Sequence, residues 1–432
     1  MIIIEYLFQK IRGAPLVERK LRLKNNIQFA ALLSSGIDSF GTGSFVSIST
    51  IFFSTYDRVS PGTIGLGLTL SAITGMMSSI PIGYLADKYG RLKLFSISYF
   101  LRAVGALCWL FINGNLQFLI YMSLFGTIDR SAASLTRSLI ISPLSKKDAT
   151  VLMGKMMLPG NIGYGLGSGF SFLLLALHLG LVPTVVANSL SFLLVIFLYR
   201  VALKDVTITS HRSLKKTLSI KVIKSALSNR FRRLLIVENF LFSFHRTLLS
   251  VYIPLIVVMN FKRYSWLSPL AFILNTIVIS LFQGRINAWA TENRRYDKLW
   301  IISGIIISVS FFITTITTVM RFEAFILIAL LILIVSQILA ELFSSAALAV
   351  YMVIYSRSES LTTDLSSINL GGQMQNVLGP TMFGRAAVSS SGLISFFMFI
   401  LTAGVSIHAY VYRGLNKKEE NVPRIKPKGG KK

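Results

Sequence analysis

Between two long apolar runs the chain reads Gly83-Tyr84-Leu85-Ala86-Asp87-Lys88-Tyr89-Gly90-Arg91-Leu92-Lys93. The runs on either side, residues 63–86 and 94–112, are each close to the ~20 apolar residues that a membrane helix needs. A connection this short and this polar predicts a tight turn between two membrane-spanning helices. Gly90 suits that turn, because glycine adopts backbone conformations that other residues avoid.

The rest of the chain is similarly apolar. Of its 432 residues, 53% are hydrophobic and 14% are charged, and the mean hydropathy is +0.66. A soluble enzyme carries about a quarter charged residues and a disordered chain is poor in hydrophobic ones, so both classes are excluded. The net charge is +27, but the basic residues lie between apolar runs, so the lipid bilayer and not nucleic acid is the expected partner. A single cysteine, Cys108, excludes a disulfide framework or a cysteine metal site.

Apolar runs and their breakers predict an all-α membrane protein with twelve transmembrane helices. A β-strand interpretation fails, because the runs are continuous and do not alternate with polar residues. The expected spans are 27–54, 63–86, 94–112, 116–141, 152–177, 180–200, 233–259, 266–288, 299–320, 323–349, 366–388 and 391–413.

Lysine and arginine residues outside the spans fall almost entirely on one side when the N-terminus is placed inside. This bias predicts that both termini are cytosolic. The longest polar segment divides the spans six plus six, and its apolar residues recur at helical spacing among lysines, which predicts an amphipathic helix on the inner membrane surface. The expected organisation is a basic cytosolic leader (1–26), an N-terminal six-helix bundle (27–200), a cytosolic linker (201–232), a C-terminal six-helix bundle (233–413) and a basic cytosolic tail (414–432).

The loop between the second and third spans resembles the signature loop of the major facilitator superfamily. Leu92 departs from the pattern, because that family has a basic residue there, although Lys93 follows at once. The matching residues are Gly83, Leu85, Ala86, Asp87, Lys88, Gly90 and Arg91. The resemblance implies two six-helix bundles around a central cavity, alternating access by rocking of the bundles, and a functional monomer.

The resemblance also implies that this loop holds the inner gate closed. Asp87 is expected to lie against the positive N-terminal end of span 366–388, where a carboxylate gains about 0.3–1 kcal/mol. Lys88 and Arg91 are expected to pair with acidic groups or lipid phosphate, and Gly83 is expected to let two helices approach closely. A loop that only anchors to lipid would explain the basic residues but not Asp87.

Glycines on span 152–177 resemble part of the antiporter motif on the fifth helix of exporters in the superfamily. The matching residues are Gly154, Gly163 and Gly167, but Ser168 stands where the motif has proline, and the closing glycines are absent. Close packing of helices is therefore favoured over an export-specific role.

Ionisable residues inside the spans are costly and mark functional sites. They gather on the first, fourth, seventh and tenth spans, which line the central cavity in the superfamily. The candidates for the cavity are Asp38, Asp129, Arg130, Arg246 and Glu341. Asp38 and Asp129 are the candidates for carrying a proton, while Arg130 and Arg246 would pair with them or contact an anionic group of a substrate. The alternative is a static ion pair between helices, which has equal weight for Asp129 and is favoured for Glu341.

The sequence thus predicts secondary active transport of a small organic solute across the plasma membrane, coupled to protons, with export favoured over uptake. The alternatives are an uptake permease of the same fold, a non-transporting sensor or assembly protein, and a lipid-modifying enzyme. No phosphate-binding loop, HExxH motif or nucleophile elbow occurs in the sequence. We therefore expect no enzymatic activity, no cofactor, no bound metal and no direct use of ATP.

Overall fold

The computed structural model is helical, and no strand occurs in the part of the chain that it describes. The predicted leader up to residue 15, the linker from 204 to 229 and the tail from 417 onward lie outside the described residues. The described residues are 16–141, 144, 146–203, 230–293, 295–320, 322–354, 361–389 and 391–416.

Two series of helices follow one another along the chain. The first series is α2 (Leu16–Thr55), α3 (Pro61–Tyr89), α4 (Arg91–Cys108), the 3-10 turn η1 (Trp109–Phe111), α5 (Asn115–Ile141), α6 (Lys146–Ala176) and α7 (Val182–Ala202). The second series is α9 (Arg230–Phe242), α10 (His245–Thr247), the π-helix η2 (Leu248–Tyr252), α11 (Ile253–Asn260), the 3-10 turn η3 (Lys262–Tyr264), α12 (Leu267–Glu292), α13 (Tyr296–Val319), α14 (Glu323–Ile354), α15 (Leu361–Val388) and α16 (Leu393–Asn416). Since α2 begins at Leu16, the first helix extends back into the predicted leader.

Among the described residues, seven helical stretches are long and apolar enough to cross a membrane. They are Arg91–Phe111, Val182–Ala202, Arg233–Asn260, Lys262–Glu292, Tyr296–Val319, Glu323–Tyr351 and Leu393–Arg413. The protein is therefore a multi-pass, all-helical membrane protein. The count of twelve spans and the cytosolic position of both termini stay predictions.

Local sequence explains where α3 begins and ends. Ser60 accepts a hydrogen bond from the backbone N–H of Thr63 at 3.4 Å, and Pro61 occupies the first turn, so the helix starts with an N-cap and a proline. Gly90 alone separates α3 from α4, and its φ of +100° lies in the region that favours glycine. The tight turn predicted at Gly90 is confirmed.

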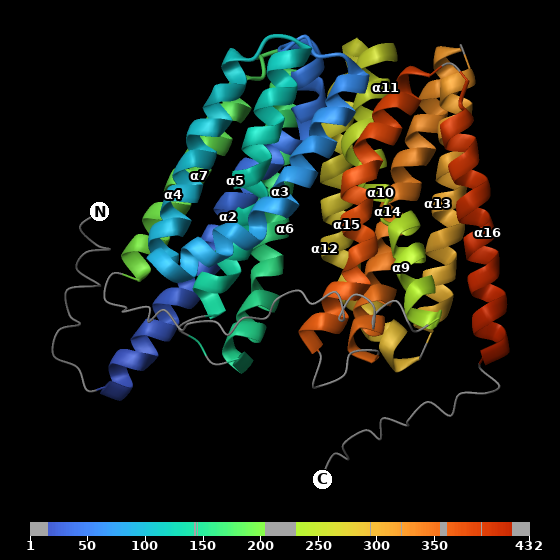
Figure 1. Cartoon of the computed structure of the whole chain (residues 1–432). Helices are drawn as coiled ribbons and strands as arrows, with labels where there is room; N and C mark the ends of the chain where they lie inside the picture. The colour runs from blue at the N-terminus through green and yellow to red at the C-terminus, as the bar shows by residue number, and fades with distance from the viewer. Residues whose placement is uncertain are drawn as a thin grey trace. The chain divides into compact units, whose positions relative to one another are not determined.

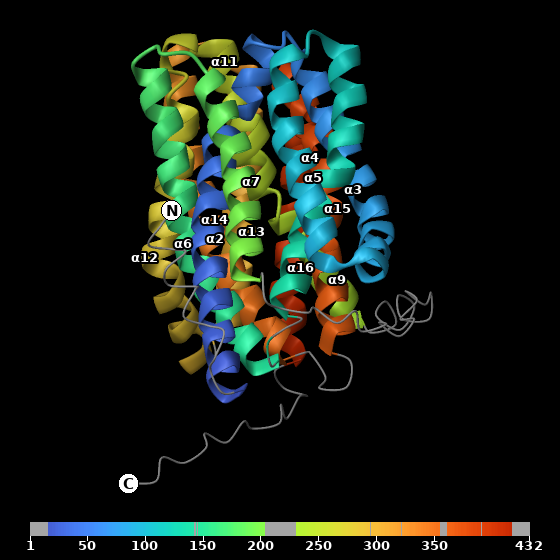
Figure 2. The same ribbon diagram turned by 90° about the vertical axis from the view of Figure 1, so that its left-hand side faces the viewer.

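The helices form two compact units. Unit 1 takes its residues from Met1–Ser219, Arg246–Phe282 and Asn376–Ser390, and unit 2 from Ile220–His245, Gln283–Gln375 and Ser391–Lys432. In unit 1, α2 packs against α6 and α7, α3 packs against α5, and α4 packs against α5 and α7 (Figures 1 and 2). In unit 2, α13 packs against α14 and α16, and α9 packs against α13 and α16.

Glycines bring α2 and α6 into backbone contact. A Cβ atom added to Gly163 would lie 2.1 Å from the carbonyl oxygen of Gly36, and one added to Gly167 would lie 2.1 Å from that of Phe40. Small residues allow this close approach between membrane helices. The packing role favoured for these two glycines agrees with their contacts. Gly154 differs, because no described atom lies within 4 Å of the position that its Cβ would take.

A second close contact joins α3 to the last part of α15 inside unit 1. It lies toward the end of the unit at which α2 ends and α3 begins, here called the distal end. A Cβ atom on Gly65 would lie 2.2 Å from the carbonyl oxygen of Pro380. The Thr69 hydroxyl donates to the Val377 carbonyl oxygen at 2.6 Å, and the Thr381 hydroxyl donates to the Thr69 hydroxyl at 2.7 Å. The Thr381 hydroxyl also lies 3.4 Å from the Gly65 carbonyl oxygen. The two helices are therefore held together by backbone contact and by the hydrogen bonds of Thr69 and Thr381.

Candidate functional site

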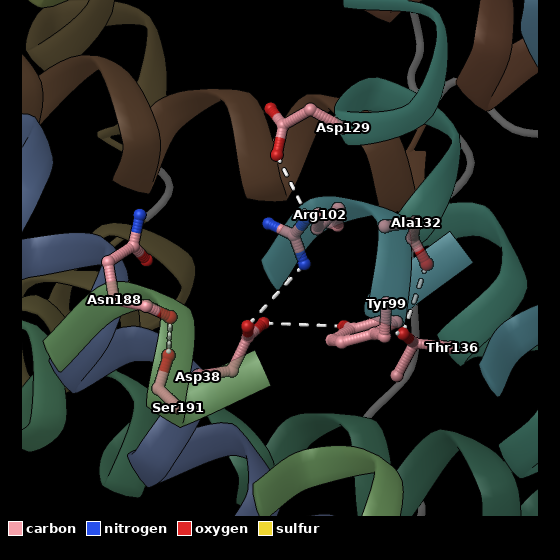
Figure 3. Close-up of polar contacts among 8 residues, drawn as sticks. All are labelled: Asp38, Tyr99, Arg102, Asp129, Ala132, Thr136, Asn188 and Ser191. Carbon is pink, nitrogen blue, oxygen red and sulfur yellow. Dashed lines mark hydrogen bonds and ion pairs between the residues drawn. The ribbon is translucent and has the colours of Figure 1, made fainter. Parts of the chain in front are cut away.

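Three helices of unit 1 bring together the first ion cluster, formed by Asp38, Tyr99, Arg102 and Asp129. Arg102 Nε lies 2.9 Å from Asp129 Oδ1, and Arg102 Nη1 lies 3.5 Å from Asp38 Oδ1 (Figure 3). Asp38 comes from α2, Arg102 from α4 and Asp129 from α5. One guanidinium group therefore joins two carboxylates from two different helices.

Helical spacing places the members of this cluster. Tyr99 and Arg102 are three residues apart on α4, so their side chains lie on one face of the helix. The Tyr99 hydroxyl donates to Asp38 Oδ2 at 3.4 Å and lies 3.0 Å from the Thr136 hydroxyl (Figure 3). Thr136 follows Asp129 by two helical turns on α5, so α5 contacts the cluster at two levels. The positions of all three helices are thus linked through Arg102 and Tyr99.

Aromatic rings fix Arg102 more firmly than its ion pairs do alone. The guanidinium carbon lies 4.0 Å from the centre of the Phe192 ring and 4.9 Å from that of Tyr99, both within the range of cation–π attraction. The Arg102 side chain is 9% exposed, whereas those of Asp38 and Asp129 are 30% and 34% exposed. The guanidinium is buried, and the side chains of Asp38 and Asp129 are half-buried.

The formal charges of the cluster do not balance. Two carboxylates face one guanidinium, and in the described part of the chain no second cation lies within ion-pair distance of either acid. An uncompensated charge away from water is expensive, because the low dielectric does not screen it. The cluster is therefore suited to accept one further positive charge.

Of the predicted site residues, the structure joins Asp38 and Asp129 but does not add the predicted arginines to them. Arg130 and Arg246 are exposed, and the guanidinium that pairs with both acids belongs to Arg102. The sequence signal for that residue was its place in an apolar span, three residues after Tyr99, because an arginine there needs a partner.

Glu341 lies in unit 2, where its Oε2 is 3.7 Å from Nδ1 of His245. Glu341 is half-buried, with a side chain 25% exposed, and His245 is buried. The pair is ionic only when the histidine is protonated. Its two members come from α14 and α10, so the predicted coupling candidate is joined to another ionisable group.

A second ion cluster in unit 2 consists of Glu238, Asp297, Trp300, Tyr351 and Arg413. Arg413 Nη2 and the indole N–H of Trp300 both donate to Glu238 Oε2, each at 2.5 Å. The Tyr351 hydroxyl donates to Asp297 Oδ1 at 2.6 Å, and Arg413 Nε lies 3.7 Å from the same oxygen. Glu238 is fully buried. This cluster ties α9, α13, α14 and α16 together.

The predicted gating loop is described only in part. The side chain of Asp87 lies outside the described residues, so its contact with α15 stays a prediction. Lys88 places its Nζ atom 5.1 Å from the centre of the Tyr89 ring, and its side chain is exposed. No described atom lies within 4 Å of a Cβ added to Gly83. No described neighbour therefore lies against Gly83, and its part in a close helix approach stays a prediction.

The turn after α2 buries a carboxylate that the sequence did not single out. Asp57 is fully buried, and neither of its carboxylate oxygens has a hydrogen-bond partner among the described residues. Burial raises the pKa of Asp57 to about 8. Its backbone oxygen accepts a hydrogen bond from Gly114 N–H at 2.8 Å, which fixes the turn against the start of α5.

The described helices are long and apolar, and they pair ionisable side chains with one another, a combination that is typical of membrane transporters. The family model described as Major Facilitator Superfamily matches residues 29–380. The chain therefore belongs to the major facilitator superfamily, and it is a transporter and not an enzyme.

Solved transporters share this fold at low sequence identity. A POT family transporter in complex with 5-aminolevulinic acid is 13% identical with a TM-score of 0.70, covering 90% of this chain and 96% of that chain. The nucleoside transporter NupG is 11% identical with a TM-score of 0.67, covering 91% and 99%. A bacterial homolog to the human lysosomal transporter Spinster is 11% identical with a TM-score of 0.70, covering 93% and 99%. No curated protein sequence matches the chain.

Proposed function

We propose that the protein is a secondary active transporter for a small organic solute, driven by protons and working as an exporter in the plasma membrane. The observation that carries the proposal is the first ion cluster, in which Arg102 joins Asp38 and Asp129. Protonation of one carboxylate would neutralise the cluster, and loss of that proton would restore its charge. A change in the hydration of the cluster during the transport cycle would switch it between its protonated and its deprotonated form.

Alternating access gives that change in hydration. The contact between α3 and α15 holds the distal end through Gly65, Thr69 and Thr381. These are a backbone contact and side-chain hydrogen bonds, with no covalent link or buried ion pair among the described residues. Such a contact can separate and re-form in each cycle, as alternating access requires. Asp87 is proposed to secure the opposite end through the N-terminus of α15.

The test is solute flux into proteoliposomes under an imposed pH gradient. The wild-type protein should move a solute faster when the gradient favours the exchange, and reversal of the gradient should reverse net flux. Asp129→Asn should transport independently of the gradient, because the remaining Asp38–Arg102 pair is neutral without a proton. Glu323→Gln is the matched control, since Glu323 is exposed in the first turn of α14. Wild-type flux that ignores the gradient would reject proton coupling.

A further inference from the structure

We propose that the solute is a monovalent organic cation, and that it competes with the proton for the single uncompensated negative charge of the first ion cluster. This inference rests on the proposed function and names its substrate class. It follows from the charge count, the position of Arg102 and the exposure of Asp129.

Among the described residues, the titratable groups seen to interact with the two acids are one arginine and three tyrosines. Arg102 and Tyr99 come from α4, and their atoms lie within 3.5 Å of a carboxylate. Tyr199 from α7 and Tyr121 from α5 lie further away. Tyrosine is neutral near neutral pH. The sum is therefore two negative charges against one positive charge, and one monovalent cation completes it.

Arg102 is already paired with both acids, and a bound cation does not need to displace it. The guanidinium uses its Nε for Asp129 and its Nη1 for Asp38, while the Phe192 ring covers it at 4.0 Å. The other carboxylate oxygen of Asp129 points away from Arg102 in Figure 3. Since the Asp129 side chain is 34% exposed, a cation can reach that oxygen while the Arg102 contact stays intact.

The chemistry of the site favours an organic cation over a metal ion. No group of three or more histidine, cysteine, aspartate or glutamate residues that could hold a metal occurs in the described ranges. Hard cations such as Ca²⁺ need about six to eight oxygen ligands, which one open carboxylate does not provide. An ammonium-type group needs only the negative charge and an apolar or aromatic surrounding.

The second ion cluster has the same formal charges but does not offer this site. Glu238 is fully buried, and Trp300 and Arg413 donate to its Oε2. The Asp297 side chain is only 18% exposed and accepts from Tyr351. Carboxylates that are covered and already bound by neighbouring donors leave little room for a solute. The first cluster is therefore the expected point of contact.

Competition for one negative charge has a direct consequence for coupling. When the cation binds beside Asp129, a proton on either carboxylate would give the cluster a buried positive charge, so the proton leaves. When the proton returns, the cation is released for the same reason. Exchange of one proton for one monovalent cation follows, and this agrees with the proposed export.

The test measures binding and proton release with purified, full-length protein in weakly buffered detergent solution. The probes are choline and benzyltrimethylammonium, with their neutral isosteres 3,3-dimethylbutanol and neopentylbenzene. We expect at least one cation to bind about tenfold or more tightly than its isostere. Its binding should release about one proton, and its affinity should rise with pH. Permanent cations carry no titratable proton, so the released proton comes from the protein.

Variants separate a charge effect from a loss of folding. Asp129→Asn should abolish proton release and weaken cation binding about tenfold or more, whereas Asp129→Glu should retain both. Asp129→Asn keeps a neutral Asp38–Arg102 pair, so its folding should be preserved, and Glu323→Gln should behave as wild type. Isosteres that bind as tightly as both cations, or cation binding without proton release, would overturn the inference. If neutral or anionic solutes show gradient-driven flux in proteoliposomes while neither cation binds, the substrate class is wrong and proton-coupled transport stands.

Discussion

Gly65→Ala should shift the protein toward a state in which the distal end is open. A Cβ at this position would lie 2.2 Å from the carbonyl oxygen of Pro380 and 2.9 Å from its carbonyl carbon. Ordinary contact between such atoms begins at about 3.4 Å, so α3 and α15 must separate by about 1 Å. Backbone atoms form the obstacle, and no flexible side chain can turn aside to make room.

The size of the shift follows from the interactions that this separation breaks. The hydrogen bonds from Thr69 to Val377, at 2.6 Å, and from Thr381 to Thr69, at 2.7 Å, both bridge the same two helices. Each contributes about 0.5–1.5 kcal/mol, so their loss costs the closed state about 1–3 kcal/mol. That free energy corresponds to a change of about 5- to 150-fold in the ratio of open to closed protein.

Distances between spin labels give the populations directly. Cysteines placed at Asn113 and Val388, both exposed residues of unit 1, carry the labels in a Cys108→Ala background. Gly65→Ala should move the distance distribution to longer values. Gly62→Ala is the matched control, because it makes the same substitution on the same helix and no described atom lies within 4 Å of its added Cβ. Equal distributions in both variants would refute the reasoning.

Three further changes have distinct expected results. Burial raises the pKa of Asp57 from 3.8 to about 8, so the folded protein holds a proton there and stability falls as pH rises between these values. Near pH 9, Asp57→Asn should therefore be more stable than wild type by about 5 kcal/mol in thermal unfolding. Matching pH profiles of stability in the two proteins would contradict this. Gly163→Ala should lower the melting temperature, because its Cβ would lie 2.1 Å from Gly36 O, whereas Gly169→Ala, with no described atom within 4 Å, should not; equal melting temperatures would reject the packing role. Asp87→Asn should slow transport or change the populations of the two open states, and unchanged kinetics would reject the gating role.

The fold and the family could be predicted from the sequence because their signals are local. Gly90 marks the turn between two apolar runs, and the structure gives that residue a φ of +100°. The residues around it carry the family resemblance, and the match over residues 29–380 confirms the family. The extent of α2 is less predictable, since the basic stretch before residue 27 predicts a separate leader, whereas the helix begins at Leu16.

The sequence predicted which acidic residues belong to the site, but not the side chain with which they pair. Asp38 and Asp129 stood out as acids in apolar spans, and the structure brings them to one guanidinium. That guanidinium belongs to Arg102 because the rotation of α4 points it at both acids, and sequence spacing does not fix how one helix is rotated against another. Arg413 and Glu238 show the same limit, since they are 175 residues apart in the chain and form a buried ion pair.

The uncompensated charge of the first ion cluster is tested most directly by infrared difference spectroscopy of the purified protein between about pH 5 and about pH 9. On going from the lower to the higher pH, the wild-type protein should lose the C=O band of one protonated carboxyl group. This band should be absent from Asp38→Asn and from Asp129→Asn, because each variant leaves a single carboxylate that Arg102 balances. If that band persists in both variants, or if the wild type shows no protonated carboxyl beyond those shared with them, the cluster does not hold an exchangeable positive charge.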